Sequence, residues 1–140
     1  MKRVVCLGSA LDVDCIGWQL AELLSGRVAA RGEEYDIKQC ATPLALPGLL
    51  KGVDALMIVD ALKGCKAGVV RVVEHSELLR DGAVSTHGFD LVTLLETARV
   101  LGELPARCVI VGIGVGETDL EPVVPDTDLV EQIHALMVAL

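Results

Sequence analysis

The sequence is poor in aromatic residues and in positive charge. Phe, Trp and Tyr make up 2% of the 140 residues, and 12 Lys and Arg are outnumbered by 20 Asp and Glu, which gives a formal net charge of -8. Nucleic-acid binding depends on clustered basic side chains and on aromatic rings that stack on bases. We therefore expect no nucleic-acid partner.

Long apolar runs are also missing, although 52% of the residues are hydrophobic. No run approaches the roughly 18 residues that a membrane-spanning helix needs. The N-terminal stretch MKRVVCLGS contains an apolar run that is too short for a signal peptide and is more typical of a first strand. We expect a cytoplasmic protein without a membrane span.

The five cysteines form no C-x-x-C pair and are odd in number. They are Cys6, Cys15, Cys40, Cys65 and Cys108. This spacing argues against a zinc knuckle and against the disulfide framework of a secreted protein. We expect reduced thiols, most of them buried.

Short apolar runs alternate with helical patterns along the chain. The expected strands are 2–8, 34–40, 55–59 and 107–114, and the expected helices are 15–32, 88–102 and 126–140. Gly32 and Gly102 are placed to end the first two helices, and Asp126 or Thr127 to cap the third. Such alternation predicts a single α/β domain, residues 1–140, with a mostly parallel sheet and helices on both faces.

Three further segments complete the expected organisation. Residues 68–75 are rich in β-branched side chains and could form an antiparallel edge strand. Residues 43–52 are interrupted by Pro and Gly, so they form a short helix at most. Residues 112–117, GIGVGE, are expected to form a turn rather than a phosphate-binding loop, because Pro122 and Pro125 prevent a helix from following directly.

Polar side chains that could bind a ligand or take part in catalysis follow three of the expected strands. Asp14 lies just before the first long helix, Asp60 follows the apolar run ALMIV, and His87 precedes the helix 88–102. Ligands of open parallel sheets collect at the carboxyl ends of the strands. Each residue also has an ordinary structural explanation: Asp14 as a helix cap, Asp60 as an acceptor of loop hydrogen bonds, and His87 as a loop histidine.

Together, two carboxylates and one imidazole make a ligand set that suits nickel, zinc or iron. Three protein ligands would leave coordination positions open for water or a substrate group. An alternative is a thiol hydrolase, in which Cys15 at a helix N-terminus is the nucleophile and His87 is its base. The sequence leaves both possibilities open.

The ordered set of motifs resembles the [NiFe]-hydrogenase maturation endopeptidases. GSALDVDCIGWQLAELL resembles their opening G-N-x-L-x-x-D-E-x-x-G block, and ALMIVDAL resembles their strand ending in aspartate. STHGFDLVTLLETARVLGELPARCVIVGIG resembles their S-x-H block with the helix and strand behind it, and DLEPVVP fits their L-E-P segment. The similarity runs from Lys2 to Leu140.

The resemblance implies a three-layer α/β/α sandwich and an endopeptidase that removes the C-terminal extension of the hydrogenase large-subunit precursor after nickel insertion. The metal-binding and catalytic positions of the family match Asp14, Asp60 and His87. The nickel would be that of the substrate, and the site could also take zinc or cadmium. We expect a monomer whose partner is this precursor.

The sequence departs from the family pattern in two places. The first loop is one residue shorter, with Asp14 in place of the commoner Glu and Asp12 as a second acidic candidate. A Gly-rich segment after the second strand is reduced to Ala41–Thr42 within QCATPLALPG. A non-catalytic metal-binding or chaperone-like module with the same fold is therefore a further alternative.

Overall fold

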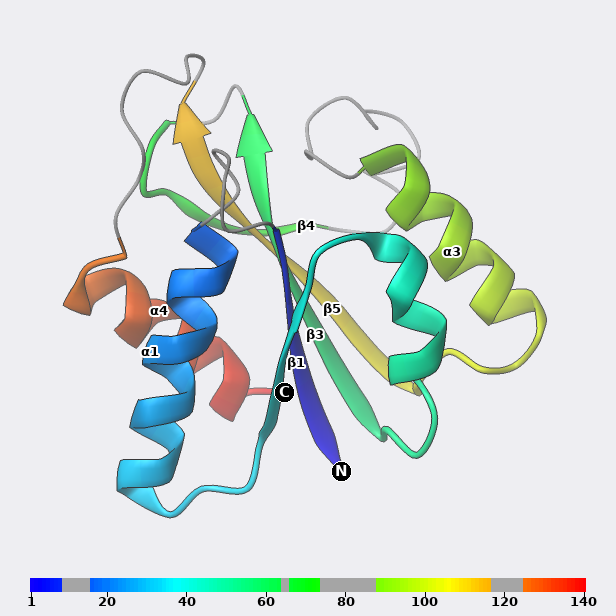
Figure 1. Ribbon diagram of the computed structural model, residues 1–140, viewed down its shortest axis with the longest axis horizontal. Helices are drawn as coiled ribbons and strands as arrows, with labels where there is room; N and C mark the ends of the chain where they lie inside the picture. The colour runs from blue at the N-terminus through cyan, green and yellow to red at the C-terminus, as the bar shows by residue number, and fades with distance from the viewer. Residues whose placement is uncertain (9–15, 64–65, 74–87, 117–124) are drawn as a thin grey trace.

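The protein is built on a five-stranded sheet (Figure 1). The computed structural model describes residues 1–8, 16–63, 66–73, 88–116 and 125–140. The strands are β1 (Lys2–Leu7), β2 (Asp36–Cys40), β3 (Ala55–Lys63), β4 (Val70–Val73) and β5 (Arg107–Gly116), in the order β2-β1-β3-β5-β4. All neighbours are parallel except β4, which pairs antiparallel with β5 at one edge. The expected sheet and its antiparallel edge are confirmed.

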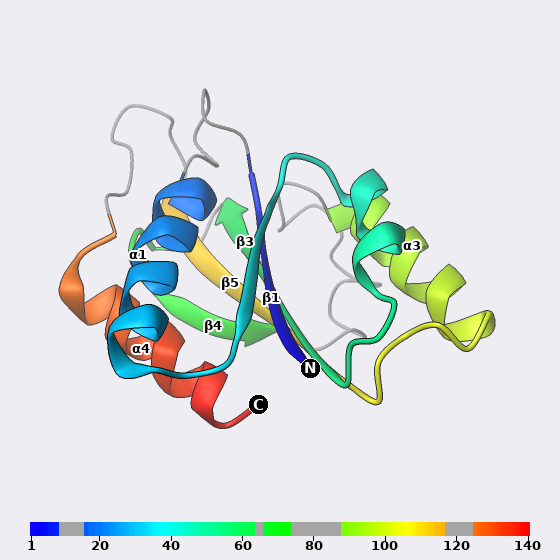
Figure 2. The same cartoon turned by 60° about the horizontal axis from the view of Figure 1, so that its bottom comes forward.

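Helices cover both faces of this sheet, as Figures 1 and 2 show. One layer contains α1 (Ile16–Arg31) and α4 (Thr127–Val138), and the other contains the 3-10 helix η2 (Pro43–Leu49) and α3 (Gly88–Val100). The arrangement is an α/β/α sandwich. Within the described ranges, no helix has both the length and the hydropathy that crossing a bilayer requires.

The central strand β3 is apolar on both faces because both faces are covered. Met57 and Val59 pack in the core beneath α1 and α4, whereas Leu56 and Ile58 pack in the core beneath η2 and α3. Strands buried on both sides have continuous rather than alternating apolar sequences. The run ALMIV therefore forms a central strand, as predicted.

The expected helix ends are confirmed. Gly32 and Gly102 follow α1 and α3 with φ values of +66° and +73°, a left-handed conformation that glycine adopts without steric cost. Asp126, rather than Thr127, caps α4, and its side chain accepts a hydrogen bond from the Leu129 N–H at 2.8 Å. These ends return the chain to the sheet.

Two strand ends differ from expectation. β3 does not end before Asp60 but continues to Lys63. The predicted strand 107–114 is confirmed and continues to Gly116, so the predicted turn over 112–117 is wrong for Gly112–Gly116. The cause is mutual pairing, because Asp60, Ala61 and Leu62 lie opposite Gly112, Ile113 and Gly114. A partner strand stabilises an extended conformation that glycine-rich sequence does not itself favour.

The first turn of α1 packs directly on the end of β1. A Cβ atom at Gly17 would overlap the carbonyl oxygen of Leu7, so only glycine allows this approach. The Trp18 indole Nε1–H donates to the carbonyl oxygen of Gly8 at 2.6 Å. The start of α1 is thereby held at the carboxyl end of β1.

We predict that Gly17→Ala destabilises the protein. The added methyl group would force α1 away from β1, which costs about 1–3 kcal/mol for overpacking. Gly26→Ala is the matched control, because Gly26 lies in the same helix with open space around its Cα, and alanine there should add about 0.5–1 kcal/mol. Urea unfolding of both variants measures the difference, and equal stabilities would contradict the close packing.

Candidate functional site

Asp60 is a carboxylate inside the core of the sheet. It is 2% exposed, although apolar residues precede and follow it in β3. The backbone N–H of Ala61 donates to its Oδ1 at 2.8 Å. A buried carboxylate is costly unless donors or cations compensate it, so its presence in a central strand needs a reason.

The position of Asp60 in the sheet is set by the register of its neighbours. Val59 lies opposite Cys6 of β1, so Asp60 is level with Leu7, the last residue of β1. Beyond this level β3 continues beside β5 without β1. Asp60 therefore lies where the sheet narrows, level with the carboxyl end of β1 but inside β3, which continues to Lys63.

The side chain of Asp60 shares a face with Ile58 and Leu62, because alternate residues of a strand point the same way. Those two residues pack in the core on the side of η2 and α3. Opposite Asp60 in β5 stands Gly112, where a Cβ atom would overlap the Leu62 side chain. Because Gly112 has no side chain, the Leu62 side chain can occupy the space beside Asp60.

Two helices begin at the same edge of the sheet. The start of α1 is fixed there by the packing of Gly17 on Leu7. The end of α3 leads to Arg107, which pairs with Ala55 at the opposite edge, so the start of α3 at Gly88 points toward the carboxyl edge (Figure 1). The described chain thus brings two helix starts and a buried carboxylate to one end of the sheet.

The other predicted site residues lie outside the described residues. These are Asp14 and His87, together with the alternatives Asp12 and Cys15. In the part of the chain that the structure describes, no group of three His, Cys, Asp or Glu side chains could hold a metal ion. Of the predicted set, the structure therefore describes Asp60.

A second histidine lies elsewhere in the core. His134 in α4 is buried, and its Nε2 lies 2.9 Å from Oε1 and 3.2 Å from Oε2 of Glu33. The sequence analysis did not predict this pair. Its one local indication in the sequence is that a histidine stands beside Ile133 and before Met137, on the apolar face of a helix. It joins α4 to the segment before β2, so its role is to hold the helix layer.

The described cysteines are ordinary core thiols. Cys6 and Cys40 are buried and Cys108 is partly buried, and none of the three is in a disulfide. Burial raises the pKa of Cys6 to about 12 and that of Cys108 to about 11. Such thiols stay protonated near neutral pH, which excludes these two as nucleophiles.

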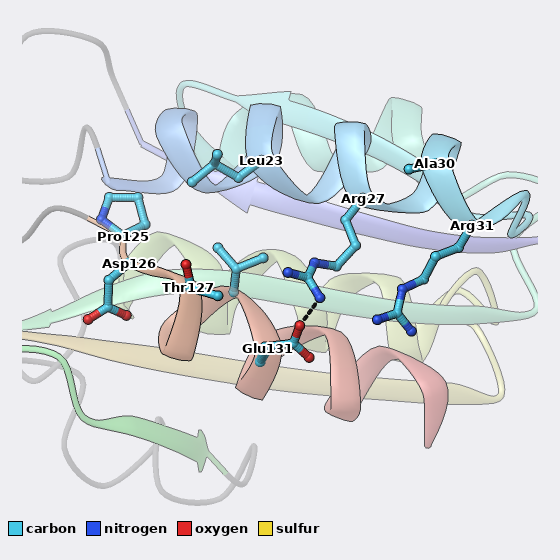
Figure 3. A pocket seen from close by; sticks show the side chains of 9 residues that line it. Leu23, Arg27, Ala30, Arg31, Pro125, Asp126, Thr127 and Glu131 are labelled. Carbon is cyan, nitrogen blue, oxygen red and sulfur yellow. Dashed lines mark hydrogen bonds and ion pairs between the residues drawn. The ribbon is translucent and has the colours of Figure 1, made fainter.

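A groove of about 780 Å³ lies between α1 and α4 (Figure 3). Arg27 of α1 and Glu131 of α4 form an ion pair across it, and Leu23 and Arg31 line its α1 side. These helices cover the face of the sheet away from the Asp60 side chain. The groove is therefore separate from the Asp60 site.

The fold is that of solved hydrogenase maturation proteases. It is similar to the maturating endopeptidase HybD from E. coli, with 22% identity, a TM-score of 0.64, and coverage of 99% of this chain and 87% of that one. HybD from Thermococcus kodakarensis matches with 21% identity, a TM-score of 0.69, and coverage of 97% and 98%. HycI from Thermococcus kodakarensis KOD1 matches with 23% identity, a TM-score of 0.67, and coverage of 99% and 88%.

The family is shown by the sequence itself. No curated protein matches the chain significantly. The family model HycI, hydrogenase maturation protease, matches residues 19–139, which is most of the chain. The chain therefore belongs to the hydrogenase maturation protease family and is a peptidase.

Proposed function

We propose that this peptidase removes the C-terminal extension of the [NiFe]-hydrogenase large-subunit precursor after nickel has been inserted. Asp14, Asp60 and His87 recognise the nickel site of that precursor. The observation that carries the proposal is the burial of Asp60, between apolar residues of β3, toward the carboxyl edge of the sheet. The protein acts in the cytoplasm as a monomer.

The cost of burying Asp60 favours a functional role. A structural strand residue at this position would be apolar, like Ile58 and Leu62 on the same face. Carboxylates retained in such places are commonly found where a charge, a metal or a reacting group must be met. A cationic metal centre is a group of this kind.

The starts of α1 and α3 support the convergence of the other two residues with Asp60. Asp14 precedes Ile16, the first residue of α1, by two positions, and His87 directly precedes Gly88, the first residue of α3. Carboxylate oxygen and imidazole nitrogen together suit nickel, and they would also accept zinc or cadmium. The three ligands come from three separate elements, as in an open site.

The nickel in this proposal belongs to the substrate. Docking of the loaded nickel site on the three residues would hold the precursor so that its scissile peptide bond lies in the active site. A carboxylate of the set takes the proton of the attacking water as general base. Because recognition requires the nickel, an unloaded precursor would not be held in place, and cleavage would report completed metal insertion.

We predict that Asp60→Asn abolishes processing without unfolding the protein. Asn keeps an oxygen that accepts from the Ala61 N–H, but loses the negative charge, so cleavage should fall about 100-fold or more. Stability should hold or rise, because a buried charge is removed. Cleavage of nickel-loaded precursor, followed by product mass, and urea unfolding measure the two effects.

The control for this variant is Asp54→Asn. Asp54 is exposed before β3 begins, at the other end of the sheet, where the N-terminal amine of Met1 lowers its pKa. Its loss of charge should leave cleavage unchanged. Full activity of Asp60→Asn would remove Asp60 from the site.

We predict that Asp14→Ala impairs cleavage far more than Asp12→Ala. Counting back from the start of α1 aligns Asp14 with the acidic position of the family block, whereas Asp12 lies two residues earlier in the shortened loop. The same precursor assay compares the variants at equal nickel loading. If Asp12→Ala is inactive and Asp14→Ala is normal, the acidic site residue of this loop is Asp12 and not Asp14.

The pair His87→Gln and Cys15→Ser separates metal recognition from thiol catalysis. If His87 is a ligand, Gln should weaken nickel-dependent cleavage about 10-fold or more, since it replaces a strong ligand by a weak one. Cys15→Ser should be nearly silent. A folded Cys15→Ser protein without activity would instead assign the chemistry to the thiol.

A further inference from the structure

Strand β2 lies at an edge of the described sheet, and its backbone groups can be assigned to the side facing β1 or to the outer side. It is the terminal strand on one side of the sheet, opposite β4. The Cys40 carbonyl oxygen accepts from the Gly8 N–H at 3.0 Å, so Cys40 faces β1. Because backbone groups alternate along a strand, Asp36 and Lys38 also face β1, while the N–H and C=O of Ile37 and Gln39 point outward.

These outward groups have no backbone partner in the part of the chain that the structure describes. The hydrogen bond that Gln39 makes, from Nε2 to the Trp18 carbonyl oxygen at 3.4 Å, comes from its side chain. Unpaired edge groups of this kind are a template for an added strand. The edge is therefore able to bind extended polypeptide.

A groove of about 430 Å³ runs beside this edge, between β2 and α1. It is lined by Ala21, Glu22, Ser25, Ile37, Lys38 and Gln39. Ile37 gives it a half-buried apolar floor. Two of the residues that line the groove are charged. Lys38 forms an ion pair with Asp36 at 3.5 Å, whereas Glu22 forms no ion pair with any described residue. An edge strand beside a helix groove is the arrangement used in peptide binding by strand addition.

We propose that an extended segment of the substrate polypeptide binds along β2 as a sixth strand. Its main chain pairs with the N–H and C=O of Ile37 and Gln39, and one of its side chains enters the groove under α1. The Glu22 carboxylate, for which no ion pair with a described residue is found, favours a basic side chain in that segment. This inference rests on the proposed peptidase function and names where the peptide is held.

The register of the sheet places this edge at a useful distance from Asp60. Cys40 pairs with Leu7, which is level with Asp60, so β2 ends at the same level. With a strand spacing of about 4.8 Å, an added strand would lie about 14 Å from β3. An extended chain covers that span in about four or five residues. The docked segment is therefore a few residues away from the bond that is cleaved.

Proline at Gln39 tests the edge. Gln39→Pro removes an outward N–H, which edge strands tolerate, whereas Gln39→Ala removes the side chain and keeps the N–H. Loss of one backbone hydrogen bond should lower kcat/KM for nickel-loaded precursor about 3- to 10-fold through KM, with kcat unchanged. Because Gln39→Ala shares the loss of the side chain, the proline variant should have a higher KM than the alanine variant, and equal kinetics for the two variants would overturn the proposal.

A bulky residue in the groove provides an independent variant. Ser25→Trp would fill the space beside β2, while Ala30→Trp places the same side chain on the same helix in the groove toward α4. Ser25→Trp should raise KM and Ala30→Trp should not. A similar KM for both would show that the groove is not used.

Amide hydrogen exchange separates this inference from the proposed function. Addition of nickel-loaded precursor to wild-type protein should slow exchange of the Ile37 and Gln39 amides, with the β1 amide of Val5 as an internal reference. If the precursor is not cleaved, the proposed function fails, and protection of these two amides still decides the docking site. Protection without precursor, together with a dimer mass, would assign the edge to a second copy and refute the proposal.

Discussion

The requirement that both faces of β3 be covered constrains the rest of the structure. Because helices cover each side, the core of β3 is apolar on both faces. The strands β1 and β5 beside it are parallel to it, and parallel neighbours need crossover connections, which bring helices onto the faces of the sheet. Within the apolar run from Ala55 to Leu62, Asp60 is the exception. Its desolvation opposes folding, so the surrounding core must be stable enough to hold a carboxylate for a purpose other than stability.

The close approach of α1 to β1 fixes the start of α1 at the end of the sheet where Asp60 lies. Gly17 allows the first turn of α1 to lie against the Leu7 carbonyl, and Trp18 fixes it with a bond to Gly8. A side chain at Gly17 would lift the helix start away from the carboxyl edge. The positions of catalytic groups in loops depend on such rigid supports, because errors of about 1 Å at a reacting centre are costly.

Much of the fold could be predicted because its signals are local. The helical spacing before Gly32, the Gly102 stop and the Asp126 cap each act within one or two turns. The extension of β3 to Lys63 and that of β5 from residue 114 to Gly116 could not, since each depends on pairing with the other. The role of Gly112, which makes space beside Asp60, also depends on strand pairing and has no local signal in the sequence. Asp60, in contrast, can be recognised from the sequence as a charge in an apolar run.

The two edges of the sheet differ in a way that bears on how a peptidase holds its substrate. β4 is antiparallel to β5 and crosses the level of Asp60 at Arg71, which pairs with Gly112, whereas β2 is parallel to β1 and ends level with Leu7 and Asp60. A polypeptide that pairs with β2 is therefore aligned with the sheet and leaves it at the level of the carboxylate. In the proposed binding mode, strand addition would recognise an extended main chain, while the carboxylate and imidazole groups would recognise the metal of the substrate. When one substrate chain carries both features, binding at one contact raises the effective concentration of the other feature at its own contact. A substrate that has both features would therefore be selected over a substrate that has only one of them.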